Sequence, residues 1–265
     1  MAFEHELEIA VTATREASAL LRMMFNEVRS VTLKGVSDLV TDADHASEAL
    51  LAERLLGAFP DDEFFGEEGS NRAATRGRRR WLVDPIDGTT NYAHGYPIFA
   101  VSVALEVDDV VELGVVAMPM LDELYVARRG AGATLNGRAL RVSEVERLTD
   151  AVVGTGFAYN LELRRANLAA WALFVERSQA ARRDGAAAFD LCCVAAGRFD
   201  GFWEHALSPW DVAAGALIAT EAGAALTNYQ GETFDLYSGE VVASNGLIHA
   251  ELLATIAEAG ERPNS

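Results

Sequence analysis

The chain has 265 residues, half of them hydrophobic, so it can bury a sizeable core. Its formal charge is −18, from 22 Lys and Arg against 40 Asp and Glu, and a surface this acidic disfavours nucleic acid and anionic membranes as partners. No apolar run reaches the roughly 18 residues that a membrane span needs. The start lacks the basic residues and apolar core of a signal peptide, so we expect a cytoplasmic protein.

The first sixty residues predict two helices. Apolar and small side chains recur at helical spacing from Leu7 to Val28, and a second helix is expected over residues 42–58, ending before Pro60. A polar loop that contains Lys34 separates them. Residues 69–80 are rich in Gly, Arg and Asn and predict an exposed loop, whose five arginines form either a solvated surface or a phosphate-binding patch.

Strands and further helices follow along the chain. Apolar runs with incomplete alternation predict strands buried on both faces at residues 81–84, 98–107, 110–117 and 123–127. Beyond them, strands are expected at 151–156, 199–203, 224–228 and 241–244, and helices at 164–179, 185–196, 209–222 and 248–259. We therefore expect one domain over residues 1–265, in which two α/β halves meet near residue 145 with a site between them.

Three acidic clusters carry the candidate chemistry. The first, residues 65–69, holds Glu67 and Glu68, which alone also fit a solvated surface. The third, residues 208–211, places Asp211 at the third position of a helix that begins with Ser208 and Pro209. A carboxylate there also fits simple stabilisation of the helix dipole. Neither cluster alone distinguishes a metal site from ordinary structure.

The second cluster, Trp81–Asn91, is the most specific. A strand delivers Asp84 to its C-terminal end, and Asp87 follows after the turn at Pro85. Two carboxylates on one tight turn suit a small, hard cation. Residues 88–90 could also begin a helix whose free N–H groups face an anion. An ordinary Asp-Gly turn explains residues 87–88 but not the strand-end aspartate or the two threonines.

In this order and at these separations, the three clusters resemble the inositol monophosphatase family. The resemblance covers residues 34 to about 223 and rests mainly on residues 84–97, while residues 39–44, 154–157 and 185–188 also look like the family. It implies a mixed α/β fold, the layered αβαβα sandwich of the inositol monophosphatase and fructose-1,6-bisphosphatase type, and usually a homodimer. The loop from Lys34 to Asp38 is one residue shorter than in animal members, which bears on lid contacts and on the affinity for the weakest metal.

The resemblance also implies roles for individual residues. Two or three Mg²⁺ ions would be held by Glu67, Asp84, Asp87, Asp211 and the backbone carbonyl of Ile86, and Glu68 would belong to the same acidic pocket. Glu67, Asp44 and Thr89 would be catalytic, the last two by positioning and deprotonating the attacking water. Phosphate and polyol would contact Gly88, Thr89, Thr155, Ala187, Glu204 and Asp211. Lys34 would lie in a mobile lid over the metals.

These roles define the hydrolysis of a small phosphorylated polyol, above all myo-inositol 1-phosphate, by a metal-activated water without a covalent intermediate. Ligands that are all oxygen favour Mg²⁺, and no His or Cys lies in the three clusters. Histidinol phosphate, fructose 1,6-bisphosphate and adenosine 3′,5′-bisphosphate remain alternative substrates. Glu204 favours a polyol because it can accept hydroxyl hydrogen bonds, although a surface carboxylate at a strand end would give the same pattern.

Three rival interpretations remain. Cys192 and Arg198 match the C-x₅-R pattern of cysteine-dependent phosphatases, but their apolar neighbours indicate a buried helix face and an inert thiol. Cys192 and Cys193 are adjacent and form neither a disulfide framework nor a zinc site, which fits a reducing compartment. Residues 42–44 resemble the D-x-D of phosphatases that form an aspartyl-phosphate, yet Thr41 and Asp44 also fit a capping box. A non-catalytic regulatory subunit with a relict site is the third, and the presence of every expected ligand argues against it.

Overall fold

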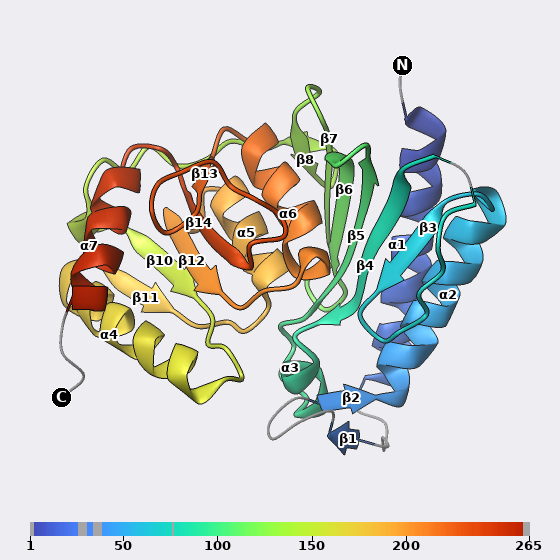
Figure 1. The fold of residues 1–265 in the computed structure, drawn as a ribbon, viewed down its shortest axis with the longest axis horizontal. Coiled ribbons are helices and arrows are strands. Elements are labelled where there is room, and N and C mark those ends of the chain that lie inside the picture. Colours follow the sequence, from blue (N-terminus) through green and yellow to red (C-terminus); the bar gives the residue numbers. More distant parts are fainter. Residues whose placement is uncertain (1–2, 26–30, 34–38, 76, 262–265) are drawn as a thin grey trace.

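The computed structural model describes residues 3–25, 31–33, 39–75 and 77–261. Two large sheets dominate it (Figure 1). The first sheet has the order β3-β4-β5-β6-β7-β8-β9, with β3 parallel to β4 and the other neighbours antiparallel. Its strands are β3 (Glu63–Gly66), β4 (Arg79–Asp87), β5 (Ala100–Val107), β6 (Val110–Met118), β7 (Glu123–Arg128), β8 (Ala133–Leu135) and β9 (Arg138–Ala139).

The second sheet has the order β11-β10-β12-β14-β13. Strand β10 runs parallel to β11 and β12, whereas β14 is antiparallel to β12 and β13. The strands are β10 (Val152–Thr155), β11 (Ala180–Arg182), β12 (Gly201–His205), β13 (Ala225–Thr227) and β14 (Glu240–Ser244), and a separate pair joins β1 (Val31–Leu33) to β2 (Leu39–Thr41). The chain passes from the first large sheet to the second between Ala139 and Val152, through the short 3-10 helix η1 (Leu148–Asp150).

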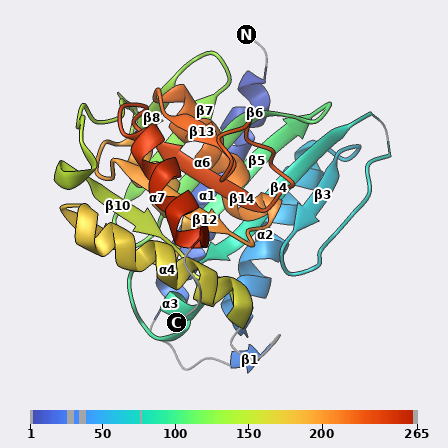
Figure 2. The same ribbon diagram turned by 60° about the vertical axis from the view of Figure 1, so that its left-hand side comes forward.

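Helices form three layers around and between the sheets (Figures 1 and 2). Helices α1 (Glu4–Met24) and α2 (Asp42–Ala58) cover the outer face of the first sheet, and α5 (Ala187–Ala195) and α6 (Pro209–Glu221) fill the space between the sheets. Helices α4 (Leu161–Arg177) and α7 (His249–Glu261) cover the outer face of the second sheet. Helix α3 (Thr89–Ala93) follows β4 directly. This arrangement is the expected αβαβα sandwich.

The middle helix layer is buried on all sides because both of its faces meet a sheet. Every residue of α5 is buried, and so are residues 212–219 of α6. Gly114 in β6 lets α6 approach closely, since a Cβ there would lie 2.9 Å from the backbone of Ala214. Among the described helices, none has the length and hydropathy that a membrane crossing requires.

Most predicted elements are present, with corrections at their ends. Helix α2 has the predicted bounds, whereas α1 spans Glu4–Met24 instead of residues 7–28, because Phe25 is already extended. Residues 26–28 lie outside the described residues. The short strands β1, β2, β3, β8, β9 and β11 were not predicted from the sequence.

The prediction of an exposed loop over residues 69–80 is only partly correct. Strand β4 begins at Arg79, whose guanidinium pairs with Asp62 at 2.9 Å and with Glu6 at 3.0 Å, and Arg80 pairs with Glu63 at 3.0 Å. Arg76 lies outside the described residues. Since carboxylates already hold Arg79 and Arg80, these two arginines form structural ion pairs and not a phosphate patch.

Candidate active site

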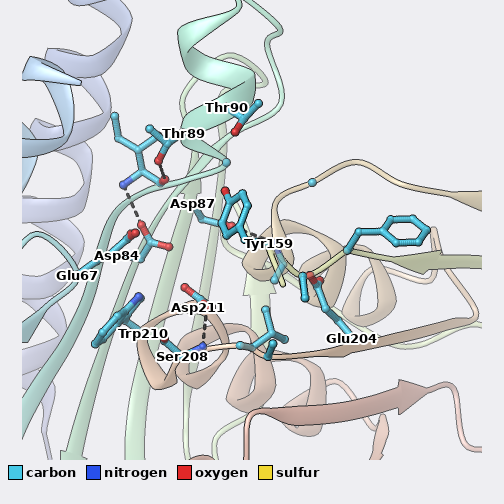
Figure 3. Close-up of a pocket in the computed structure, with 18 of the residues that line it drawn as sticks. Glu67, Asp84, Asp87, Thr89, Thr90, Tyr159, Glu204, Ser208, Trp210 and Asp211 are labelled. Atoms are coloured by element: carbon cyan, nitrogen blue, oxygen red, sulfur yellow. Dashed lines mark hydrogen bonds between the residues drawn. The ribbon is translucent and has the colours of Figure 1, made fainter. Parts of the chain in front are cut away.

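The three acidic clusters converge on one cavity of about 360 Å³ between the two halves. Figure 3 shows Glu67, Asp84 and Asp211 at one end and Glu204 at the other. The lining comprises Glu67, Asp84, Ile86, Asp87, Gly88, Thr89, Thr90, Phe157, Ala158, Tyr159, Arg183, Gly185, Ala187, Glu204, His205, Ala206, Leu207, Ser208, Trp210 and Asp211. Residues distant in sequence therefore share one polar site.

A break in the pairing of β4 brings two aspartates to the cavity. The register with β5 shifts between Asp84 and Asp87, so both carboxylates face the site instead of alternating. The backbone N–H of Ile86 donates to Asp84 Oδ1 at 2.9 Å and fixes that side chain. Gly88 then turns the chain with a φ of 94°, a conformation that favours glycine.

Asp87 also closes the N-terminus of α5. Its carboxylate accepts the backbone N–H groups of Ala187 at 3.0 Å and Ala188 at 2.8 Å. The residue before the helix, Ala186, has no side chain that could cap it, so the cap comes from the other half of the chain. The pKa of Asp87 is raised to about 7, mainly by burial and also by the charge of Glu67, against the lowering effect of these N–H groups.

The carboxylates at this end of the cavity repel one another. Burial raises the pKa of Asp84 well above its usual value, and the charges of Glu67, Asp87 and Asp211 raise it further. Among the described residues, no group of three or more Asp, Glu, His or Cys side chains is already arranged to hold a metal ion. The cavity suits a hard divalent cation by the chemistry of its donors. Four carboxylates and the Ile86 carbonyl form an all-oxygen set, and such a cation would offset the charge of the carboxylates.

Asp211 and Glu67 reach the cavity from two further elements. Asp211 Oδ2 accepts the Ser208 N–H at 2.7 Å at the start of α6, as its position after Ser208 and Pro209 predicted. Glu67 follows β3, and its backbone N–H donates to the Val83 carbonyl of β4 at 3.2 Å. The stabilising and functional interpretations of these clusters are therefore compatible, since each turn is held by its own hydrogen bonds while a carboxylate faces the cavity.

Asp44 and Thr89 meet behind the end of the cavity that holds Glu67, Asp84 and Asp211. The Thr89 hydroxyl lies 3.0 Å from Asp44 Oδ1 and 3.0 Å from the Ile86 carbonyl, and it donates to one at a time. Asp44 also forms the predicted capping box of α2 with Thr41, whose N–H donates to Asp44 Oδ2 at 2.7 Å. Asp44 is fully buried and does not line the cavity itself, so it acts on the site through Thr89.

Glu204 occupies the opposite end, where β12 ends. A Cβ at Gly156 would overlap its carboxylate, which explains the glycine in the segment 154–157. The pKa of Glu204 is raised to about 8, mainly by burial and then by the charges of Asp211 and Asp87, against the lowering effect of Arg183. Sequence reasoning gave no role to Arg183, the one Arg or Lys among the described cavity residues.

Two further predicted site residues, Thr155 and Glu68, do not line the cavity. Thr155 was expected to face the polyol, but it is fully buried and its hydroxyl donates to the Trp203 carbonyl at 2.6 Å. Among the described residues, the lining does not include Glu68, which was expected in the acidic pocket. Its backbone N–H donates to Glu48 at 2.7 Å. Lys34 lies outside the described residues.

Several lining residues were not anticipated. Phe157, Tyr159, His205 and Trp210 surround the carboxylates, and Figure 3 shows the Tyr159 ring between Asp87 and Glu204. Trp210 lies within the third cluster and Phe157 within the segment 154–157, so both had a positional signal. Tyr159 and His205 had none, because only the tertiary fold brings the loop of Tyr159 and the end of β12 to the cavity.

The C-x₅-R interpretation is excluded by geometry. Cys192 is fully buried, and burial raises the pKa of its thiol well above the usual value. Arg198 donates to both carboxylate oxygens of Glu123, at 2.8 and 2.5 Å, and so does not face a phosphate loop. The prediction that the two cysteines are inert core residues fits this arrangement.

Comparison with known proteins shows the family to which the chain belongs. The model of the inositol monophosphatase family matches residues 3–261. The chain is 44% identical to an inositol-1-monophosphatase of Rhizobium meliloti, over 90% of this chain and 91% of the relative, and 39% identical to the Nus factor SuhB of Vibrio cholerae, also over 90% and 91%. A solved inositol monophosphatase from Anabaena superposes with a TM-score of 0.89 at 35% identity, covering 100% of this chain and 98% of the other. This chain therefore belongs to the inositol monophosphatase family and is a phosphoric monoester hydrolase.

Proposed function

We propose that the protein hydrolyses myo-inositol 1-phosphate to inositol and phosphate with two or three bound Mg²⁺ ions. The observation that carries the proposal is the single cavity that joins four carboxylates at one end to Glu204 at the other. Bound Mg²⁺ would supply the positive charge that lowers the pKa of a water and offsets the charge on the leaving oxygen. Glu67, Asp84, Asp87, Asp211 and the Ile86 carbonyl would hold it.

The residues of the chain divide the remaining work. The Thr89 hydroxyl, hydrogen-bonded to Asp44, is placed to accept a proton from the attacking water and to pass its own to Asp44. The backbone around Gly88 and Thr89 would orient the phosphate, so that water attacks in line with the leaving alkoxide. Glu204 would accept hydroxyl hydrogen bonds from the polyol. Ala187 lines the same cavity and would contact the polyol.

The proposal is tested by phosphate release from four esters, with Mg²⁺ present or chelated: myo-inositol 1-phosphate, histidinol phosphate, fructose 1,6-bisphosphate and adenosine 3′,5′-bisphosphate. We expect release only with Mg²⁺ and the highest kcat/KM for myo-inositol 1-phosphate. A higher kcat/KM for histidinol phosphate would refute the inositol assignment and leave the metal-dependent phosphatase intact. No release from any ester would favour the non-catalytic regulatory role.

A substitution at Glu204 tests the polyol end. A site built to hydrogen-bond a hydroxyl rejects analogues that lack it, because its buried polar groups are left unpaired. Glu204→Gln should therefore narrow the preference for the inositol ester over histidinol phosphate and scarcely change kcat/KM for p-nitrophenyl phosphate. An equal loss for all three esters would contradict a role in polyol recognition.

We further propose a cytoplasmic homodimer. The two buried free cysteines fit a reducing compartment. Analytical ultracentrifugation of the purified protein measures the oligomeric state directly.

A further inference from the structure

A carboxylate that the mechanism above does not use lies behind the turn that carries Glu67. Glu48, in α2, is only 1% exposed. Within the described residues it has no ion pair, and its two oxygens accept the backbone N–H groups of Glu68 at 2.7 Å and Ser70 at 2.8 Å. Burying a charge is costly unless it is hydrogen-bonded. These two charge-assisted bonds therefore account for a buried glutamate at this position.

The same turn is held on its other side. The N–H of Glu67 donates to the Val83 carbonyl at 3.2 Å, one residue before Asp84 in β4. The N–H of Gly66 donates to the side-chain oxygen of Asn71 at 3.1 Å. Glu67 thus lies between backbone groups that are bonded to β4 and to α2. The position of this turn decides where the Glu67 side chain enters the cavity.

Gly66 shows that the contact with Glu48 is tight. A Cβ at Gly66 would overlap the Glu48 carboxylate and lie 2.8 Å from the ring of Phe64. The φ of Gly66 is not positive, so its backbone conformation does not require glycine. The requirement is instead the close approach of the Glu48 side chain to the backbone before Glu67.

Helix α2 holds two more segments of the site from the same face. One turn before Glu48, Asp44 meets Thr89, and the Ser47 hydroxyl donates to the Pro85 carbonyl at 3.1 Å. Positions 44, 47 and 48 are neighbours on one helix face. The face of α2 that packs against β4 is therefore polar where it meets the site. Ser47 and Asp44 are bonded to Pro85 and Thr89, at the end of β4 and the start of α3, and Glu48 is bonded to the turn after β3.

We propose that Glu48 is a positioning residue, whose carboxylate holds residues 66–70 so that Glu67 enters the cavity as a metal ligand. This inference rests on the proposed function, which makes Glu67 a ligand of Mg²⁺. Glu48 contacts neither the cation nor the substrate. It acts as the hydrogen-bonded support that a ligand-bearing turn needs.

The test is Glu48→Gln, which keeps the shape of the side chain but turns an amide NH₂ toward one of the two N–H donors. Loss of such a supporting partner costs roughly 10–100-fold in metal affinity. We expect the Mg²⁺ concentration at half-saturation to rise at least about tenfold, in titration calorimetry and in the Mg²⁺ dependence of Tm, while KM for the ester at saturating Mg²⁺ stays unchanged. The control is Glu53→Gln, an exposed glutamate of the same helix that pairs with Arg54, and it should change neither.

Gly66→Ala disturbs the same contact from the backbone of the turn, because its Cβ would overlap the Glu48 carboxylate. It should also weaken Mg²⁺ binding, although Glu48 is unchanged. It decides the question if Glu48→Gln does not fold. Wild-type Mg²⁺ affinity in a folded Glu48→Gln protein, or in a folded Gly66→Ala protein when the first variant is lost, overturns the positioning role alone. Absence of Mg²⁺ binding by the wild-type protein would overturn the proposed cofactor, and with it this inference.

Discussion

Asp87 contributes a carboxylate to the cavity and closes the N-terminus of α5 with the same two oxygens. Asp87→Asn removes the charge but keeps one acceptor, so the fold should persist. Loss of a metal ligand should cost more than the roughly 10–100-fold typical of a supporting residue. We therefore expect activity to fall at least about 100-fold at ordinary Mg²⁺, with unchanged circular dichroism. Turnover near that of the wild type would remove Asp87 from the metal site.

Cys192 provides the opposite case, a residue whose pattern suggests chemistry and whose surroundings prevent it. Cys192→Ser should keep turnover within about tenfold. It should lower the free energy of unfolding by about 1–3 kcal/mol, because the new hydroxyl is buried at a position built for a thiol. Activity should also survive a thiol alkylator. Thermal denaturation and kcat measure the two effects, and a folded but inactive variant would restore the cysteine-nucleophile mechanism.

Individual residues show where sequence reasoning succeeds and where it stops. Asp84, Asp87 and Asp211 were found because each lies on a turn whose local chemistry is visible in the sequence. Thr155 was misplaced because strand periodicity does not reveal that its hydroxyl is taken up by the Trp203 carbonyl. Glu48 gave no signal at all, since its partners are backbone N–H groups twenty and more residues away.

Helices and strands also divide into those whose bounds are set by local sequence and those whose bounds depend on distant partners. The bounds of α2 are local: Thr41 and Asp44 cap its start, and Phe59 and Pro60 follow its end. Strand β4 was expected to end at Asp84, but it continues to Asp87. The register with β5 shifts between these two residues, so that pairing resumes at Asp87 after the turn. Short edge strands such as β8 and β9 depend on pairing with a neighbour and carry too few residues for a periodic pattern.

The loop between β13 and β14 ties the two sheets together. The Tyr237 hydroxyl donates to Glu106 Oε2 at 2.7 Å and accepts from Arg80 at 3.0 Å. Glu106 is buried, and its other oxygen has no hydrogen-bond partner among the residues that the structure describes. Tyr237→Phe should therefore lower the free energy of unfolding by about 1–3 kcal/mol and leave kcat unchanged. The control is Tyr96→Phe, whose half-exposed hydroxyl makes no hydrogen bond among the described residues. Equal stability of the two variants would show that the tie contributes nothing.

At the scale of the whole molecule, the cavity exists only where the halves meet. Strand β4 brings Asp84 and Asp87 from the first sheet, whereas Glu204 ends β12 of the second. Asn91 ties them, since its amide donates to the carbonyls of Ile98 and Asp184, at 2.7 Å each. We therefore propose that the halves, which meet near residue 145, fold as one domain. Calorimetry should then show a single unfolding transition.

The concentration of buried carboxylates makes the stability of the metal-free protein depend on pH. The folded-state pKa is about 7 for Asp87 and about 8 for Glu204, and burial, the largest cause for each, also raises the pKa of Asp84 and Asp190. In the unfolded chain these carboxyls lose their protons near pH 4. Between about pH 4 and 8 the folded state therefore binds more protons, and stability must fall as pH rises.

We therefore expect the Tm of the protein in a chelator to decrease from pH 5.5 to 8.5. Saturating Mg²⁺ should flatten this slope, because a bound cation favours the ionised carboxylates. General repulsion in a chain of charge −18 would also lower the Tm with rising pH, so two variants with the same change in charge separate the causes. Glu204→Gln should reduce the slope, whereas Glu53→Gln on the exposed face of α2 should not. If both variants reduce it equally, the pH dependence arises from the overall charge and not from the site.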